Sequence, residues 1–269
     1  PWARDPFAGE IGDGRIHGRG SSDMKAGVAA MVVAALASAP QLARSPGLTL
    51  VFTAGEETGC EGAFDLARRG VLGQAGAIVV GEPSSNAPVV GHKGCLRVRC
   101  ITSGVTAHSS MPELGDNAIY KAARAIGALE RFDLSDATHP VVGRPTLVVS
   151  QVQGGMNMNS VPDRAEIGVD VRTVPGQDLA QLRERIQAAV GRAAAIEPIV
   201  EVPGLLTSAD DEWVQSVFAA AQELAGAAPA TRILPYFTEG SVLRPAYGEP
   251  PAVILGPGES SLAHQTDES

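Results

Sequence analysis

Apolar runs separated by short polar turns form most of the first third of the chain. Residues 24–36 are apolar on nearly every side, which predicts a buried helix. Residues 48–52 and 77–80 are short continuous apolar runs, typical of strands covered on both faces, and residues 62–69 between them predict a helix. This alternation of strands and helices indicates an α/β fold with a largely parallel sheet.

The pattern changes near residue 92. Residues 95–101 alternate apolar and polar side chains, as a half-exposed antiparallel strand does. A helix, two strands, a helix and a strand are then expected at residues 117–131, 146–152, 164–172, 179–195 and 199–202. The order β-α-β-β-α-β is that of a ferredoxin-like module. We therefore expect an inserted domain over residues 92–202, with residues 1–91 and 203–269 forming the domain that it interrupts.

Two further segments belong to the interrupted domain. A glycine-rich stretch at 9–20, with a strand-like patch around Ile16, predicts a hairpin or loop that enters the first helix. After the insertion we expect a helix at 212–225 and an apolar strand at 251–256, followed by a loop that carries His264.

Composition excludes several classes of function. A net charge of −9 and a pI near 5.1 argue against a nucleic-acid or anionic-membrane surface. No run of eighteen apolar residues and no signal peptide is found. The 3 cysteines lack C-x-x-C spacing, so we treat them, like His139, as structural. These features favour a protein of the reducing cytoplasm.

Five ionisable side chains lie just beyond an apolar strand or at the start of a helix. Glu56 and Glu57 follow the run 48–52, and the other three are Asp23, Glu82 and His264. Each alone has an ordinary explanation: a solvated turn, a helix N-cap or a surface histidine. Together they suit zinc or a similar cation, because a two-metal site needs a bridging carboxylate, further ligands and a base.

Four motifs stand in order along the chain and identify a family resemblance. They are Gly-Arg-Gly-Ser-Ser-Asp-Met-Lys-Ala-Gly at 18–27, Thr-Ala-Gly-Glu-Glu at 53–57, Gly-Glu-Pro at 81–83, and Gly-Pro-Gly at 256–258 leading to Ala-His-Gln at 263–265. From residue 2 to residue 268 the chain resembles the di-zinc amidohydrolases that include acetylornithine deacetylase, succinyl-diaminopimelate desuccinylase, aminoacylase and glutamate carboxypeptidase. In that family the ferredoxin-like insertion is a lid and dimerisation domain beside a zinc-peptidase-like catalytic domain.

The resemblance implies a role for each of the five side chains. Asp23 would bridge two zinc ions, for which cobalt or manganese are possible substitutes, and Glu56 would be the general base. Glu57 and His264 would hold one ion, and Glu82 the other. The resemblance also implies a cis peptide bond between Asp23 and Met24.

Three lid residues also match the family. His108 would stabilise the oxyanion of the tetrahedral intermediate, often in the partner subunit's active site, which implies a homodimer. Asn159 and Arg172 would hold the substrate, since an arginine fork suits a carboxylate.

One expected motif is missing. The family carries a His-x-Asp loop upstream of Asp23, and His17, the one upstream histidine, stands where the family has a strand residue. We expect that the chain begins after that loop and stops before the family's end, so that the ion held by Glu82 lacks one ligand.

The expected activity is hydrolysis of the amide bond of an N-acyl amino acid by metal-activated water. Residues 92–94, 171–176 and 237–240 look more like acetylornithine deacetylase than like the desuccinylase. Three alternatives stay open: a succinyl-diaminopimelate desuccinylase, a dipeptidase or carboxypeptidase of the same family, and a non-catalytic remnant that binds ligand or dimerises.

Overall fold

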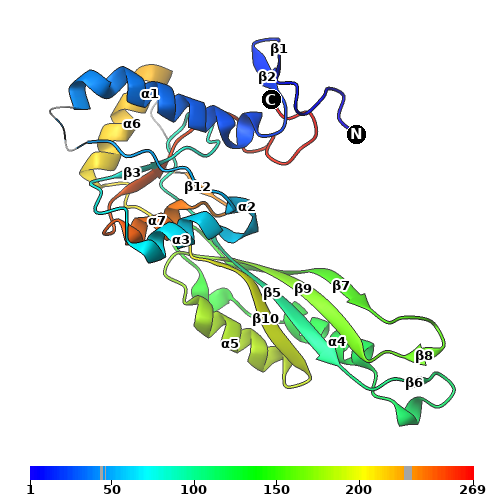
Figure 1. Cartoon of the computed structure of the whole chain (residues 1–269). Coiled ribbons are helices and arrows are strands. Elements are labelled where there is room, and N and C mark those ends of the chain that lie inside the picture. The colour runs from blue at the N-terminus through cyan, green and yellow to red at the C-terminus, as the bar shows by residue number, and fades with distance from the viewer. Residues whose placement is uncertain (43–44, 46, 227–231) are drawn as a thin grey trace.

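The computed structural model describes residues 1–42, 45, 47–226 and 232–269 of the chain. Two parts are visible in Figure 1: an α/β part that contains both termini, and an elongated four-stranded part below it. The predicted combination of an α/β unit with a ferredoxin-like insertion is confirmed.

The four-stranded part is an antiparallel sheet with the order β10-β5-β9-β7. Its elements are β5 (Gly94–Ser103), α4 (Ala118–Glu130), β7 (Thr146–Gly154), β9 (Arg164–Thr173), α5 (Leu179–Val190) and β10 (Ala194–Val202). Side chains of α4 and α5 share one hydrophobic core with the alternate, apolar side chains of the strands. Leu96 and Ile167 come from the strands, and Leu182 and Ile186 from α5. The helices therefore cover one face of the sheet, and the polar positions of its strands lie on the other.

The last helix and strand of this part differ from their predicted bounds. The helix expected over 179–195 ends at Val190, because Gly191 at φ 72 stops it, and residues from Ala194 onward join β10. The side chain of Asp178 caps the start of α5 by accepting from the backbone N–H of Gln181.

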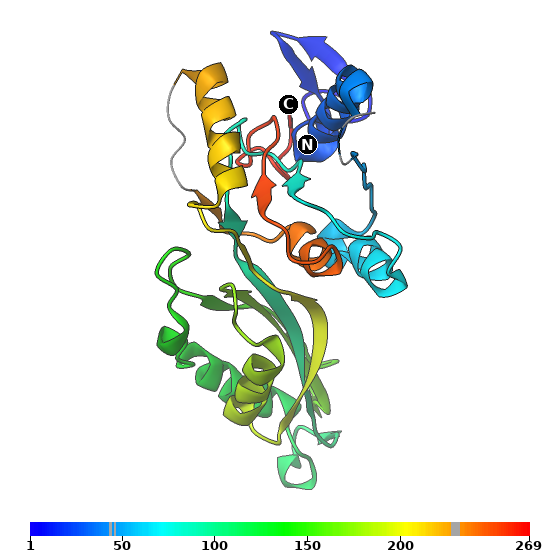
Figure 2. The same cartoon turned by 90° about the vertical axis from the view of Figure 1, so that its left-hand side faces the viewer.

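The central strands of the α/β part form two small sheets, one of two strands and one of three. β3 (Ile78–Val80) pairs in parallel with β13 (Ala252–Ile254), and β4 (Gly91–His92) pairs in parallel with β12 (Ile233–Leu234) and antiparallel with β11 (Leu205–Leu206). Figure 2 shows α1 (Ala26–Leu42) on one side of these strands and α6 (Glu212–Ala225) on the other. The remaining elements are the hairpin β1 (Glu10–Gly12) and β2 (Arg15–His17), α2 (Glu56–Gly59), α3 (Glu61–Arg69), α7 (Gly240–Ala246), and, in the four-stranded part, β6 (Ala107–His108) and β8 (Ser160–Val161).

Three predictions about burial or strand formation are wrong. Residues 48–52 form no strand, and Phe52 is 53% exposed. The helix α1 forms, but Gly27 is its one buried residue, and β3 is half-exposed where full burial was expected. Apolar composition favours the helix, whereas burial needs a second layer that composition alone does not supply.

The apolar helix α1 also bears on membrane association. The segment Ser21–Leu42 is long and apolar enough to cross a membrane by length and composition. This is weak evidence for a span, because a core helix of a soluble protein passes the same test.

Two adjacent connections join the two parts. β4 runs into β5 through Lys93, and β10 returns toward β11, which pairs with β4. A second core, which includes Cys60, Cys95, Val202, Phe237 and Val242, contains side chains from both parts. The near end of the four-stranded sheet therefore packs against the α/β part.

Candidate metal centre

The parallel strands β3 and β13 bring two of the expected ligands to one edge of the sheet. Glu82 follows β3, and the loop that carries His264 follows β13. Gly81 and Gly256 meet where the strands end: a Cβ atom on Gly256 would lie 2.3 Å from the carbonyl oxygen of Gly81. A side chain at position 256 would push the strand ends apart, which explains the Gly at this position.

Glu56 and Glu57 begin the one-turn helix α2. Gly55 precedes them at φ 85, and Cys60 closes the turn by donating its backbone N–H to the carbonyl oxygen of Gly55 at 2.8 Å. Gly59 packs against the side chain of Val200 on β10. Glu56 and Glu57, the expected base and the expected ligand, are thus held between the α/β part and the four-stranded sheet.

Asp23 lies in the Ser21–Lys25 turn that leads into α1. Its peptide bond to Met24 is cis, as the resemblance implies. Gly27 seats the following helix on the end of β3, because a Cβ atom there would lie 2.0 Å from the carbonyl oxygen of Gly81. Asp23 is therefore placed beside Glu82 at the same sheet edge.

Asp23, Glu57 and His264 meet in space. Nε2 of His264 lies 2.9 Å from Oε1 of Glu57 and 3.4 Å from Oδ2 of Asp23. One donor atom from each residue lies within 4.8 Å of the others. Two carboxylates and an imidazole at this spacing fit a divalent cation such as zinc. The side chains of Glu57 and His264 are 61% and 65% exposed, so the cluster is open to solvent on that side.

Two further carboxyl groups crowd this cluster. Burial, followed by the nearby Asp23 and Glu56, raises the pKa of Glu82 to about 9, so the carboxyl groups of Asp23 and Glu82 lie close to each other. Burial, followed by Glu57, Asp23 and Glu239, raises the pKa of Glu56 to about 8, while Arg97 acts in the opposite direction. Carboxylates packed this closely favour a cation between them.

The substrate-binding candidate Arg172 lies on the polar face of the four-stranded sheet. Its Nε donates to Oδ1 of Asp170 at 2.8 Å, and the Nε of Arg97 donates to the other oxygen of Asp170 at the same distance. The two guanidinium groups thus share one carboxylate. Of these two arginines, Arg97 has a charge that acts to lower the pKa of Glu56.

His108 and Asn159 are not brought to the metal cluster within this chain. They lie in or beside the short strands β6 and β8, at the end of the four-stranded part farthest from α2 in Figures 1 and 2. The backbone N–H of Ser109 donates to the carbonyl oxygen of Asn159 at 2.9 Å, and Nδ1 of His108 lies 2.7 Å from Oγ of Ser110. His108 and Asn159 therefore lie on neighbouring segments of the chain, separate from the cluster.

The sequence interpretation did not assign three residues that lie around the centre. Arg97 could have been found from the register that pairs it with Asp170. Glu239 follows the motif residue Thr238 and accepts a hydrogen bond from the hydroxyl of Thr53, while its Oε1 is buried without a partner among the described residues. Glu268 stands four positions after His264 and is fully buried.

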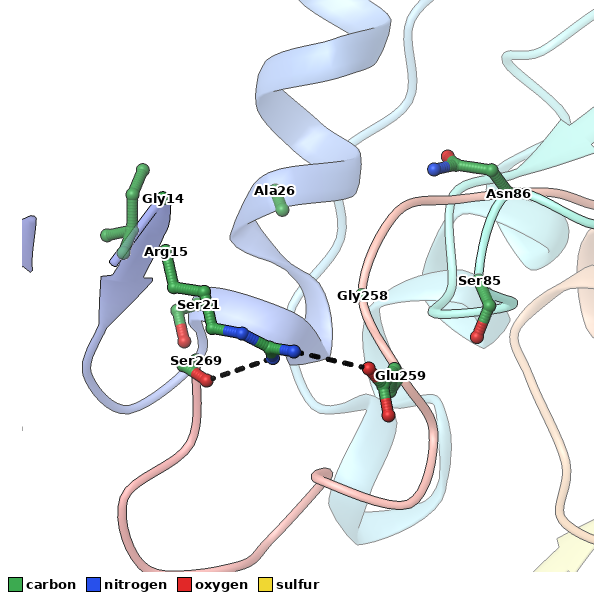
Figure 3. A pocket seen from close by; sticks show the side chains of 10 residues that line it. Gly14, Arg15, Ser21, Ala26, Ser85, Asn86, Gly258, Glu259 and Ser269 are labelled. Carbon is green, nitrogen blue, oxygen red and sulfur yellow. Dashed lines mark hydrogen bonds and ion pairs between the residues drawn. The ribbon is translucent and has the colours of Figure 1, made fainter. Parts of the chain in front are cut away.

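The pocket in Figure 3 is a different site. It has a volume of about 520 Å³, and Ser21 and Ala26 are among its lining residues. Arg15 crosses it, with one nitrogen 3.6 Å from Oε1 of Glu259 and another 3.4 Å from Oγ of Ser269. None of the five expected metal-site residues lines it.

Comparison with known proteins agrees with this geometry. Residues 90–197 match the model of the M20 peptidase dimerisation domain. Acetylornithine deacetylase from Myxococcus xanthus is 36% identical, over 95% of this chain and 68% of that protein. A probable succinyl-diaminopimelate desuccinylase from Staphylococcus epidermidis is 29% identical, over 99% of this chain and 74% of that protein.

Solved structures have the same fold. An aminopeptidase PepT from Bacillus cereus superposes with a TM-score of 0.74 at 26% identity, covering 96% of this chain and 70% of that one. An M20 family metallo-carboxypeptidase from Sulfolobus solfataricus gives a TM-score of 0.81 at 20% identity, covering 99% and 76%. From the fold, the domain match and the relative at 36% identity, we conclude that this chain belongs to the M20 family of metallohydrolases acting on amide bonds.

Proposed function

We propose that this protein hydrolyses the amide bond of N-acyl amino acids, as acetylornithine deacetylase does, with two zinc ions as cofactors. The observation that carries the proposal is the meeting of Asp23, Glu57 and His264 within 4.8 Å, next to the half-buried carboxyl group of Glu56. This set supplies metal ligands and a base at one place, which is what hydrolysis of an unactivated amide needs.

The proposed ligand roles follow from the contacts. Asp23 contacts His264 on one side and Glu82 on the other, so it is the residue suited to bridge two ions. Glu57 and His264 would hold one ion, and Glu82 the second. Bound zinc would lower the pKa of a water molecule and polarise the substrate carbonyl.

Glu56 is the proposed proton carrier. Its carboxylate would accept the proton of the attacking water and then donate it to the nitrogen of the leaving amine. Glu56 lies beside Glu57 but is more buried, since Glu57 points toward His264. This division lets one glutamate hold metal while its neighbour moves a proton.

Substrate binding would involve residues 92–202 as a lid. Arg172 would face the substrate carboxylate, and Asn159 and His108 would act in the site of the partner subunit of a homodimer. The separation of β6 from α2 in one chain supports a role for His108 in the site of a partner. The M20 dimerisation match over 90–197 also supports a dimer.

A substrate panel tests the proposal. The metal-loaded protein should release amine from N-acetylornithine faster than from N-succinyl-diaminopimelate, and a chelator should abolish both reactions. Hydrolysis of dipeptides but not of acetylornithine would instead favour a peptidase, an alternative that the fold shared with PepT supports. Absence of bound metal and of every hydrolytic activity would favour a non-catalytic remnant.

A further inference from the structure

The carboxylate of Glu268 is fully buried and bonded by four donors. Oε2 accepts from Nη1 of Arg19 at 2.8 Å and from the backbone N–H of Gly20 at 3.1 Å. Oε1 accepts from the backbone N–H groups of Ser22 and Asp23 at 3.0 and 2.9 Å. The exposed fraction of Glu268 is 0%. The side chain of Glu268 therefore binds the backbone N–H groups of Gly20, Ser22 and the proposed ligand Asp23.

The same short segment carries a ligand. His264 lies four positions before Glu268, and its Nε2 is 3.4 Å from Oδ2 of Asp23. The segment 264–268 thus connects the two donors: it supplies the imidazole and, through Glu268, holds the backbone of the aspartate that the imidazole faces.

Other contacts anchor the turn but do not reach Asp23. Oγ of Ser22 accepts from the backbone N–H of Glu259 at 2.9 Å, and Lys25 donates its backbone N–H to the carbonyl oxygen of Gly20 at 2.8 Å. Figure 3 shows Ser269 next to Ser21, with Glu259 farther along the same C-terminal segment, so this segment returns to the turn. Among the contacts of the described residues, the Glu268 bond is the one made to the backbone N–H of Asp23.

We propose that Glu268 is a positioning residue for metal binding, which sets the carboxylate of Asp23 at the distance from His264 that a shared ion requires. The inference rests on the proposed metal site. The carboxylate of Glu268 accepts two hydrogen bonds at each of its oxygens. A glutamine at this position would keep one accepting oxygen but would turn an NH₂ group toward the other pair of donors, which it cannot accept from. Side chains that hydrogen-bond to a metal ligand and hold it in place raise the affinity of the site for the metal.

The test compares two variants of equal charge change in the full chain. Glu268→Gln removes one accepting oxygen, and Glu259→Gln alters an acid on the same loop whose side chain is 52% exposed. Zinc affinity is measured by competition with a chromogenic chelator, and the visible spectrum of the cobalt-loaded protein reports ligand geometry. We expect Glu268→Gln to weaken zinc binding by about 10–100-fold and to change the cobalt spectrum, with Glu259→Gln unchanged.

Equal affinity and identical spectra in the two variants would overturn the inference while leaving the metal site intact. Loss of the fold in Glu268→Gln, seen as the absence of a cooperative thermal transition, would also overturn it, because Glu268 would then support the whole fold and not one ligand. Failure of the unsubstituted protein to bind zinc would contradict the metal site itself.

Discussion

Nε2 of His264 lies 2.9 Å from Oε1 of Glu57, although 207 positions separate the two residues. Glu57 comes from the one-turn helix α2, and His264 from the loop after β13. With Asp23 also 3.4 Å from the same nitrogen, the imidazole stands between two carboxylates. That arrangement is a donor set for a cation, and it underlies the predictions below.

Removal of the imidazole should weaken metal binding. His264→Asn removes one metal-binding atom from the cluster. Removal of a group that only hydrogen-bonds to a metal ligand lowers metal affinity by roughly 10–100-fold, so removal of the ligand itself should lower zinc affinity by at least as much. The measurement is metal per chain by atomic spectrometry after dialysis against a fixed free zinc concentration. His139→Asn is the control, since Nδ1 of His139 accepts from the backbone N–H groups of Val141 and Val142, and His139 belongs to no group of metal-ligating side chains among the described residues. An equal zinc content in both variants would contradict the assignment.

A side chain at position 256 should lower the free energy of unfolding, because Gly256 lies so close to Gly81. Gly256→Ala places a Cβ atom 2.3 Å from the carbonyl oxygen of Gly81, and such overpacking costs typically about 1–3 kcal/mol of unfolding free energy. Urea unfolding checks this, with Gly76→Ala as control because a Cβ atom there has no neighbour within 4 Å. Equal stability of the two variants would contradict the predicted clash between position 256 and Gly81.

Much of the fold could be predicted from local patterns. Alternating positions gave β5 and β9 their buried and polar faces, and the order of elements indicated the ferredoxin-like insertion. The exposure of α1 and the absence of a strand at 48–52 could not be predicted, because both depend on neighbouring layers. Periodicity reports what a segment could bury, and the tertiary structure decides what it does bury.

The residues of the site also fall into two groups, those that local motifs predicted and those that they did not. The motifs placed Asp23, Glu57 and His264 beside strand or helix ends, and the structure brings them together. Arg97 and Glu268 could not be assigned, since their importance comes from partners distant in sequence, Asp170 and the backbone of Gly20 to Asp23. Long-range hydrogen bonds leave no local signature.

The buried side chain of His92 should make stability depend on pH. Burial lowers the pKa of His92 from 6.5 to about 4, and Nδ1 contacts the carbonyl oxygen of Lys93 at 2.9 Å. Below pH 6.5 the histidine takes a proton in the unfolded chain but not in the folded one. Stability should therefore fall as the pH drops from 6.5 to 4, by about 3 kcal/mol at most, and the effect should be complete below that range.

The comparison that isolates this effect uses His92→Asn, which keeps a donor for the Lys93 carbonyl but does not titrate. Unfolding free energies from urea titrations at pH 7.5 and pH 4.5 should differ less in the variant than in the unsubstituted protein. Parallel pH dependence in the two proteins would show that His92 is not the source.

The dimer assignment predicts complementation between inactive variants. His108→Ala and Glu56→Gln should each be inactive, but a mixed dimer would contain one site with Glu56 from one chain and His108 from its partner. Random equal mixing makes half of the dimers mixed, so about a quarter of the unsubstituted activity should return. The readout is amine release after joint refolding, and absence of recovery in verified mixed dimers would place His108 in its own chain's site or in none.

The role of Glu56 is the central claim, and its amide variant tests it most directly. Glu56→Gln keeps the shape of the side chain but cannot accept a proton from water. The account predicts that turnover of N-acetylornithine falls by about 10²–10⁴-fold while the zinc content per chain stays equal to that of the unsubstituted protein. Near-normal turnover by Glu56→Gln with zinc still bound would contradict it.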